Sequence, residues 1–271
     1  MQNQNLISVS DINSWLYCSR KVYLSKICGL KTPPNRNMII GRLKHNILEH
    51  LSKEEEKLVS QIDSSHESID MVFMYEEFIK RISAKIFADN MQLIDRFMID
   101  KEDILKKVLR DFSGDIKLRV ASIKQAISSG FTKDTIWKNL DTIYISELPV
   151  ESERLGLKGR VDRVLISKKD NTIMPFELKS REERIFPSDE IQLTAYAMML
   201  EDYYHQEIKK GFIDVGNNRQ EIDISQERRD RVIQIIEEIR GIYEENPQIP
   251  PMQSNFNKCR NCEFREECAK L

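Results

Sequence analysis

Two acidic residues lie on facing halves of a predicted β-hairpin. Residues 159–166 and 173–179 are largely apolar runs that flank the polar residues 168–171, and this order is typical of two strands joined by a turn. If the turn is centred within that polar segment, Asp162 lies directly opposite Glu177 on the same face of the hairpin. Their Cβ atoms would then be about 4.5–5.5 Å apart. The spacing therefore predicts a pair of carboxylates held face to face.

Two facing carboxylates repel each other unless a cation lies between them. Carboxylate oxygens with few other fixed ligands suit Mg²⁺ or Mn²⁺, which keep bound waters and share the phosphate of a substrate. Lys179 follows Glu177 by two residues and shares its face, where an ammonium can orient an attacking water and offset charge on phosphorus. We therefore expect a metal-dependent site for phosphodiester hydrolysis. The alternative is a hairpin whose charged residues face solvent, and a register slip of one residue would remove the arrangement.

The cysteines form a second group of chemically active residues. Cys259, Cys262 and Cys268 supply three thiolates within ten residues, one fewer than a tetrahedral zinc site or a cubane iron–sulfur cluster requires. Cys18 or Cys28, from the other end of the chain, can supply the fourth. An odd number of five cysteines in a cytosolic chain argues against a disulfide framework. The spacing indicates a metal site, and the thiolates alone do not separate zinc from iron–sulfur.

The carboxylate hairpin resembles a nuclease motif. Gly159-Arg160-Val161-Asp162 followed by Glu177-Leu178-Lys179 is similar to the PD-(D/E)XK motif in its RecB-like form. Gly41-Arg42-Leu43-Lys44-His45 matches the position of that family's histidine ligand, and Gln192 and Tyr196 match its glutamine and tyrosine on the following helix. The resemblance implies a restriction-endonuclease-like fold with Mg²⁺ or Mn²⁺ in the site. It implies catalysis by Asp162, Glu177 and Lys179, a cleft lined by Gln192 and Tyr196, and metal ligation by His45, Asp162, Glu177 and the backbone carbonyl of Leu178.

The N-terminal cysteine lies in a second motif of the same kind. Tyr17-Cys18-Ser19-Arg20-Lys21 resembles the cysteine motif of the iron–sulfur RecB-like nucleases, which place one cysteine before the nuclease core and three after it. Cys28 has no counterpart in that pattern, and we expect it to be a small buried apolar residue. A cluster joining the two ends of the chain would stabilise the fold. With zinc as the alternative, the resemblance implies a 4Fe–4S cluster held by Cys18, Cys259, Cys262 and Cys268.

Together these motifs resemble those of the CRISPR-associated RecB-like exonucleases, the fourth Cas family. Membership would imply a metal-dependent single-stranded DNA exonuclease that trims DNA ends for spacer acquisition, with the CRISPR integrase proteins as partners. One alternative is a free-standing DNA repair or phage-type nuclease, which the genomic neighbourhood would distinguish. The other is a non-catalytic iron–sulfur protein that binds DNA ends, which a metal-dependent cleavage assay would distinguish. Glu177 and Lys179 argue against the non-catalytic alternative.

The charge of the chain is unevenly distributed. Its 271 residues carry a net charge of −2, which excludes a uniformly basic nucleic-acid coat. Residues 1–51 nevertheless contain seven basic and two acidic side chains, so a basic N-terminal region precedes an acidic body. A solvated helix face would explain the same pattern. We expect DNA phosphate contacts from five of the basic residues, namely Arg20, Lys21, Arg36, Arg42 and Lys44.

Neither a membrane span nor a secretory signal is expected. The longest purely apolar run covers residues 195–200, far short of the roughly 20 residues of a membrane-spanning helix. The first five residues lack the charged and apolar regions of a signal peptide. These features predict a cytoplasmic protein with no membrane partner.

The elements that must position these residues divide the chain into four segments. Apolar residues at helical spacing predict that residues 1–51 form basic helices with the first cluster cysteine and the histidine motif, and that 52–140 form a helical insertion. Strand and helix patterns over 141–246 predict the nuclease core, and 247–271 hold the remaining cluster cysteines. The predicted fold is therefore α/β, with a mixed sheet flanked by helices, a helical insertion, and an iron–sulfur module joining the two termini.

Two serines are expected to begin helices of the core. Ser188 precedes an apolar helical run, although Ile191, three residues later, cannot complete a capping box. Ser225 precedes a second run that extends to about Tyr243.

Overall fold

The computed structural model describes residues 6–179, 184–215, 218–243, 248–252 and 255–271. In these residues the helices are α1 (Val9–Tyr17), α2 (Ser19–Lys26), α3 (Arg36–Val59), α4 (Ser68–Asp89), α5 (Met91–Arg96), α6 (Lys101–Ser128), α7 (Lys133–Ile136), α8 (Pro187–Tyr204), α9 (Gln226–Gly241), α10 (Phe256–Arg260) and α11 (Arg265–Cys268). The strands are β1 (Ile7–Ser8), β2 (Thr142–Ser152), β3 (Leu157–Ser167), β4 (Thr172–Lys179), β5 (Lys210–Val215) and β6 (Asn218–Asp223).

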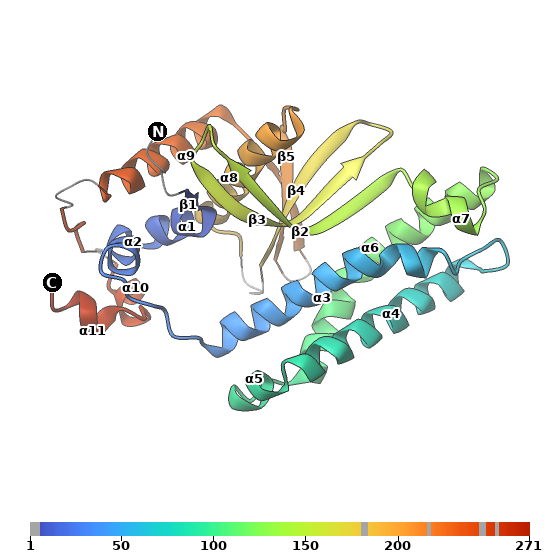
Figure 1. The fold of residues 1–271 in the computed structure, drawn as a ribbon, viewed down its shortest axis with the longest axis horizontal. Coiled ribbons are helices and arrows are strands. Elements are labelled where there is room, and N and C mark those ends of the chain that lie inside the picture. The colour runs from blue at the N-terminus through green and yellow to red at the C-terminus, as the bar shows by residue number, and fades with distance from the viewer. Residues whose placement is uncertain (1–5, 180–183, 216–217, 244–247, 253–254) are drawn as a thin grey trace.

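Within the described residues the strands form one six-stranded sheet (Figure 1). β2 pairs along one edge of β3, and the other edge of β3 pairs first with β1 and then with β4. β5 and β6 continue the sheet beyond β4. The β1–β3 and β4–β5 pairs are parallel and the remaining pairs are antiparallel, so the predicted mixed sheet is confirmed.

The β3–β4 hairpin has the predicted register. Its ladder ends with the pair Arg163 and Phe176, and extending this register by one residue places Asp162 opposite Glu177. At that point a side chain continues the contact between the strands, because Leu178 N donates a hydrogen bond to Asp162 Oδ2 at 2.7 Å. Asp162 and Glu177 are only 8% and 4% exposed, which excludes a solvent-facing hairpin at these positions.

Of the two core helices, α9 begins where the sequence predicts and α8 does not. α9 begins directly after Ser225, as predicted, and the Ser225 side chain accepts a hydrogen bond from Arg228 N. α8 instead begins at Pro187, whose fixed φ suits the first helical position, so Ser188 lies inside the helix and the prediction that it caps α8 is wrong. The first turn of α8 is closed by Asp189, whose Oδ2 accepts a hydrogen bond from Phe186 N at 2.8 Å.

Two separate apolar cores support the chain. One lies between the sheet and α1, α8 and α9, and the other lies within α3 to α7, which we call the helical layer. α3 runs unbroken across residue 51, so the predicted boundary between residues 51 and 52 falls inside a helix. The first predicted segment is divided instead between α2 and α3, where Pro33 and Pro34 cannot extend a helix. α1 and α2 therefore pack on the sheet core, whereas α3 packs in the helical layer.

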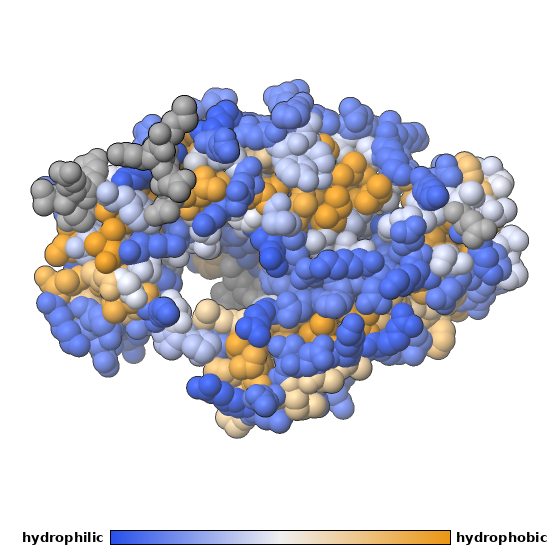
Figure 2. Space-filling model, in the orientation of Figure 1, coloured by the Kyte–Doolittle hydropathy of each residue, from blue (hydrophilic) through white to orange (hydrophobic). Residues whose placement is uncertain are grey.

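The helical layer covers one side of the sheet, and α1, α8 and α9 cover the other. Figure 1 shows α3, α4 and α6 as long helices along one side of the strands. At one end of the molecule α2, α10 and α11 gather into what we call the terminal module (Figure 1). Figure 2 shows a hollow between the terminal module and the helical layer. None of the helices in the described ranges is long and apolar enough to cross a membrane.

Candidate active site

Three acidic residues lie side by side across adjacent strands. The β2–β3 register places residue 147 opposite residue 162, and the β3–β4 register places residue 162 opposite residue 177. Glu147, Asp162 and Glu177 therefore form an acidic row across β2, β3 and β4. Glu147 has a backbone φ of 55°, in the left-handed region that few residues with a Cβ adopt. Such strained backbone is concentrated at functional sites, so it directs attention to this row.

His45 reaches the acidic row from α3. Its Nδ1 lies 2.5 Å from Glu147 Oε1 and 3.5 Å from Asp162 Oδ1. One ligand atom from each of these three residues lies within 4.8 Å of the other two, a spacing that a single metal ion can bridge. α3 holds this position because it also binds β2, where Ser52 Oγ donates a hydrogen bond to Tyr144 O at 3.0 Å.

The acidic row concentrates negative charge in a buried place. Burial, followed by the neighbouring charge of Glu177, raises the pKa of Asp162 well above its ordinary value. Burial alone would lower the pKa of His45, but the hydrogen bond with Glu147 and the charge of Asp162 raise it to about 9. Glu177 Oε2 is buried and has no hydrogen-bond partner among the described residues. An unpartnered carboxylate oxygen beside two further acids is an environment that a divalent cation neutralises.

Lys179 lies at the same site, on the strand face that α8 covers. Its Nζ contacts Glu177 Oε1 at 2.7 Å, Gln192 Oε1 at 2.9 Å and Asp189 Oδ1 at 3.2 Å. Burial alone would lower the pKa of Lys179, but Glu177 and Asp189 raise it, so the side chain stays a charged ammonium. Gln192 Oε1 also accepts a hydrogen bond from Asn13 Nδ2 at 3.1 Å, which ties α8 to α1.

Tyr196 lies one turn after Gln192 on α8 and next to the carboxylates. Burial, together with the charges of Glu177 and Asp162, holds the pKa of Tyr196 far above its usual value, so the phenol stays protonated. β3 approaches this ring closely because residue 159 is glycine. A Cβ at Gly159 would lie 2.8 Å from Tyr196 Cε1, closer than such atoms approach in proteins. The glycine of the motif therefore allows β3 to pack against α8 beside the site.

Sequence reasoning missed two residues of this site, Glu147 and Asp189. The apolar alternation of β2 changes phase between Ile145 and Leu148, and this is the visible trace of the irregular backbone at Glu147. Asp189 is missed because placing the helix cap at Ser188 hides the carboxylate that closes α8 and contacts Lys179. The predicted residues that the structure brings together around the acidic row are His45, Asp162, Glu177, Leu178, Lys179, Gln192 and Tyr196.

Two of the basic residues predicted to contact phosphate lie in the terminal module. Arg20 Nε donates a hydrogen bond to Pro250 O at 2.8 Å. Lys21 Nζ forms an ion pair with Glu263 Oε1 at 2.8 Å. Both side chains therefore join the N-terminal helices to the C-terminal segment, and their contact with phosphate stays a prediction.

The other three predicted phosphate contacts lie on α3. Lys44 is partly buried in the pocket that also contains His45 and pairs with Asp111 Oδ2 at 3.2 Å. Arg36 and Arg42 are exposed near the start of the helix. These residues share α3 with His45, and their contact with phosphate also stays a prediction.

The terminal module contains a cavity with a distinctive set of donors. Tyr17 OH donates a hydrogen bond to Lys258 O at 2.8 Å and so holds α1 against the C-terminal segment at the wall of the cavity. Arg20, Lys21, Lys258, Arg260 and Arg265 also line it, and this cationic wall suits an anionic metal–thiolate group. The sulfur donors come from both ends of the chain, namely Cys18, Cys259, Cys262 and Cys268. The donor set therefore fits a metal or cluster with four thiolate ligands.

Cys28 is not among the residues that line this cavity, and it is exposed. The prediction that Cys28 is buried is therefore wrong. α2 ends at Lys26, and Gly29, with a φ of 69°, turns the chain into the linker toward α3. Cys18 is left as the N-terminal cysteine that shares a cavity with the other three.

Nearly the whole chain is similar to one protein superfamily. Residues 6–269 match the PD-(D/E)XK nuclease superfamily. The chain belongs to it. This confirms the predicted α/β nuclease core with a mixed sheet flanked by helices, and it accounts for the motif carried by β3 and β4.

Three relatives of this PD-(D/E)XK nuclease cover different parts of it. A CRISPR-associated exonuclease Cas4/endonuclease Cas1 fusion of Leptospira interrogans is 32% identical over 126 residues, 43% of this chain and 23% of that protein. A DNA replication ATP-dependent helicase/nuclease of Arabidopsis thaliana is 25% identical over 253 residues, 85% of this chain and 18% of that protein. The CRISPR-associated exonuclease Cas4 of Francisella tularensis is 24% identical over 121 residues, 45% of this chain and 60% of that protein. The nuclease spans less than two thirds of each relative, and the predicted resemblance to the CRISPR-associated exonucleases is confirmed.

Proposed function

We propose that this nuclease cleaves DNA with Mg²⁺ or Mn²⁺ held by His45, Glu147, Asp162 and Glu177, with the backbone carbonyl of Leu178 as a further ligand. One observation carries the proposal: His45, Glu147 and Asp162 offer ligand atoms within 4.8 Å of one another, beside the unpartnered Oε2 of Glu177. Carboxylates with a single imidazole suit these ions, which take oxygen ligands and keep waters for a phosphate substrate.

The residues around the metal ligands supply the other parts of the reaction. A divalent ion held there would activate a water molecule and offset charge on the phosphate. Lys179, an ammonium fixed by Glu177 and Gln192, orients the attacking water and stabilises the charge that develops on phosphorus. Tyr196, a protonated phenol, donates a hydrogen bond to a phosphate oxygen. With these groups in place, hydrolysis requires no nucleophile from the protein.

The substrate we propose is a DNA end with a single-stranded segment. The protein would act on it as an exonuclease, removing nucleotides from the end. Two relatives are CRISPR-associated exonucleases, and in one of them the exonuclease is fused to the endonuclease Cas1. We therefore propose that the protein trims DNA ends for spacer acquisition with an integrase of the Cas1 type as its partner. The similarity to a replication helicase/nuclease keeps a DNA repair nuclease as the alternative, which the genomic neighbourhood distinguishes.

The cavity of the terminal module is where we propose that a 4Fe–4S cluster binds. Cysteine thiols from both ends of the chain meet there, and basic side chains surround them. The cluster would hold the two ends together in addition to the contacts that Tyr17 and Lys21 already make. Zinc on the same ligands is the alternative, and it is separated by colour because zinc is d¹⁰ and gives no charge-transfer band in the visible range. The ligands are Cys18, Cys259, Cys262 and Cys268.

Cleavage of end-labelled single-stranded DNA tests the proposed activity. The wild type should cut in Mg²⁺ or Mn²⁺ and should stop cutting when the metal is chelated. Asp162→Ala removes one of several crowded carboxylates, so it should fold and should lose activity by orders of magnitude. Asp170→Ala, which changes an exposed acid in the turn of the same hairpin, is the matched control and should keep the wild-type rate.

Two results would overturn the proposal. Equal rates of cleavage by Asp162→Ala and the wild type would show that the metal site is elsewhere. Wild-type protein that binds DNA ends tightly but never cuts them, whatever the metal, would establish the non-catalytic alternative.

A further inference from the structure

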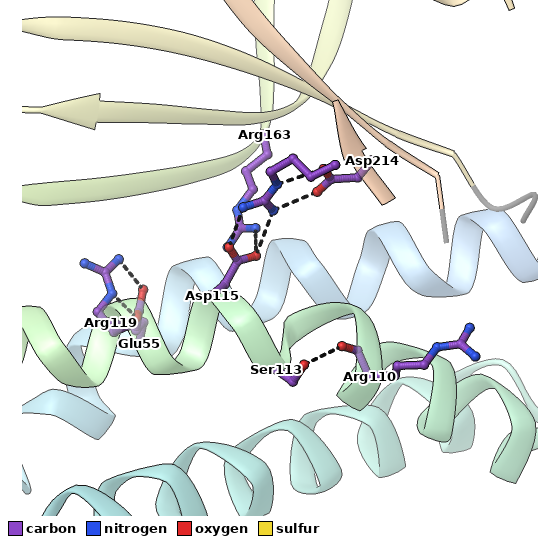
Figure 3. Close-up of polar contacts among 8 residues, drawn as sticks. Glu55, Arg110, Ser113, Asp115, Arg119, Arg163 and Asp214 are labelled. Atoms are coloured by element: carbon purple, nitrogen blue, oxygen red, sulfur yellow. Dashed lines mark hydrogen bonds and ion pairs between the residues drawn. The ribbon is translucent and has the colours of Figure 1, made fainter. Parts of the chain in front are cut away.

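A buried acid of the helical layer contacts the sheet beside the pocket that His45 and Lys179 line. Asp115, on α6, is 5% exposed and lies between two arginines of the sheet (Figure 3). Its Oδ2 accepts from Arg163 Nη1 at 2.6 Å, and its Oδ1 accepts from Arg219 Nη1 at 3.0 Å. Arg219 also binds Asp214 with two hydrogen bonds of 2.8 Å. Four charged residues from α6, β3, β5 and β6 are therefore linked in one chain of contacts.

Aromatic rings hold the two arginines in place. The guanidinium of Arg163 lies 4.1 Å from the centroid of the Tyr144 ring and 5.1 Å from that of Phe112. The guanidinium of Arg219 lies 4.9 Å from the centroid of Phe176. Stacking of this kind fixes the plane of each guanidinium and adds to the hydrogen bonds.

These residues are immediate neighbours of the proposed metal ligands. Arg163 follows Asp162 on β3, and Phe176 precedes Glu177 on β4. Asp214 of β5 pairs with Leu178 in the β4–β5 ladder. The contacts of α6 therefore involve residues directly beside Asp162, Glu177 and Leu178 in the sheet.

The electrostatics show that Asp115 is charged in this place. Burial alone would raise its pKa, but Arg163 and Arg219 lower the pKa of Asp115 below the ordinary value. Arg163 is 6% exposed, and its Nε is buried with no hydrogen-bond partner among the described residues. Loss of the Asp115 charge would leave Arg163 buried without a counter-charge, and β3 would have to move to solvate it.

We propose that Asp115 is a positioning residue for the nuclease reaction: through Arg163 and Arg219 it fixes β3, β4 and β5 where they carry Asp162, Glu177 and Leu178. The inference rests on the proposed metal-dependent function. It gives the helical layer a role in the site beyond the His45 ligand, because the layer then also supports the strands that carry the carboxylates.

Glu55 and Arg119 offer a matched control within the same layer. They form a second buried pair, with Arg119 Nε 2.7 Å from Glu55 Oε1, and Arg119 lies one turn after Asp115 on α6 (Figure 3). Arg119 contacts the sheet at the carbonyl of Thr142. Thr142 forms the first pair of the β2–β3 ladder, five residues before Glu147 of the acidic row. Glu55→Gln therefore removes a comparable buried charge without touching a neighbour of a proposed metal ligand.

Mn²⁺ binding to the protein without DNA, measured by calorimetry, tests the proposal together with kcat and KM for DNA. Changes behind metal ligands lower metal affinity by roughly 10–100-fold, so Asp115→Asn should weaken Mn²⁺ binding by this amount and lower kcat while KM stays near the wild-type value. Glu55→Gln should lower the melting temperature in a similar way but keep the Mn²⁺ dissociation constant within about twofold, because it leaves the ion pair of Arg163 with Asp115 intact.

A double variant separates positioning from folding. Asp115→Asn with Arg163→Met removes the uncompensated cation, so it should recover melting temperature but not Mn²⁺ affinity, and it serves where the single variant fails to fold. Asp115→Asn with wild-type Mn²⁺ affinity, an equal loss of affinity in Glu55→Gln, or recovery of affinity in the double variant would each overturn the proposal. A wild type that binds no Mn²⁺ would instead overturn the proposed metal-dependent function.

Discussion

Replacing Lys179 with methionine removes one positive charge while keeping most of the side-chain volume. Lys179 Nζ lies 2.7 Å from Glu177 and 3.2 Å from Asp189, and these two acids are 4% and 1% exposed. The variant therefore leaves two buried carboxylates without this cation. Breaking a buried ion pair by removing one partner costs about 3–5 kcal/mol, so we expect the metal-free variant to lose unfolding free energy of this order.

Metal binding should survive this change because Lys179 is not one of the proposed ligands. A divalent ion adds positive charge beside Glu177, so Mn²⁺ should restore part of the lost stability. Turnover should not recover, because Lys179 is the ammonium placed to stabilise charge on phosphorus. Removing one such electrostatic stabiliser lowers kcat by about 10²–10³-fold, which corresponds to about 2.7–4 kcal/mol of transition-state free energy.

Single-turnover cleavage at saturating Mn²⁺, with calorimetric titration of the metal, measures both effects. Lys44→Met is the matched control, since Lys44 lines the same pocket as Lys179 but pairs with Asp111 rather than with a proposed ligand. It should raise KM for DNA and leave kcat within a few-fold of the wild type. Loss of Mn²⁺ binding in Lys179→Met would assign Lys179 a structural role, and a wild-type kcat would refute its role in the transition state.

The other predictions concern packing, the cysteines and DNA contact. Gly159→Ala places a Cβ 2.8 Å from Tyr196 Cε1, so overpacking should lower the free energy of unfolding by about 1–3 kcal/mol. Urea denaturation measures this, and an unchanged midpoint would contradict the close β3–α8 contact. Anaerobically purified protein should absorb broadly at about 400 nm, a band that zinc with its d¹⁰ shell cannot give. Cys18→Ala should lose this band and much of the stability, whereas Cys28→Ala should keep both, and the reverse result would exchange the two ligands. Arg42→Ala should lower the salt dependence of affinity for single-stranded DNA by about 0.7 in log–log slope if its side chain contacts one phosphate, and an unchanged slope would leave Arg42 as a solvated residue.

The sequence predicts local features of the site better than those set by distant contacts. The register of the β3–β4 hairpin follows from its apolar runs and its turn, because a slip of one residue would expose buried side chains. The backbone of Glu147 has no such local cause. Its side chain contacts His45, 102 positions away on α3, and in the sequence only a change of phase in the strand pattern marks this position.

The basic N-terminal region shows the same limit for charge. Counting lysines and arginines predicts cations available for DNA, but the count does not show where their partners lie. Arg20 and Lys21 find theirs in the C-terminal segment, at Pro250 and Glu263. The predicted burial of Cys28 is wrong for a related reason. An apolar residue type says little about burial where a glycine turns the chain away at the end of a helix.

The separation of the two apolar cores has a consequence for how the protein opens. Ile39, Leu43 and Ile47 anchor α3 in the helical core, yet the same helix carries His45, whereas Asp162 belongs to the strands of the other core. A metal ion held by both residues would join these two parts of the protein, which already contact each other through hydrogen bonds, ion pairs and stacked side chains. Separating the two parts would then remove a ligand from the metal, so metal binding would add to the free energy of separation, by about 2.7 kcal/mol at a free metal concentration one hundred times the dissociation constant. The free energy needed to separate the two parts would then depend on the metal concentration around the protein.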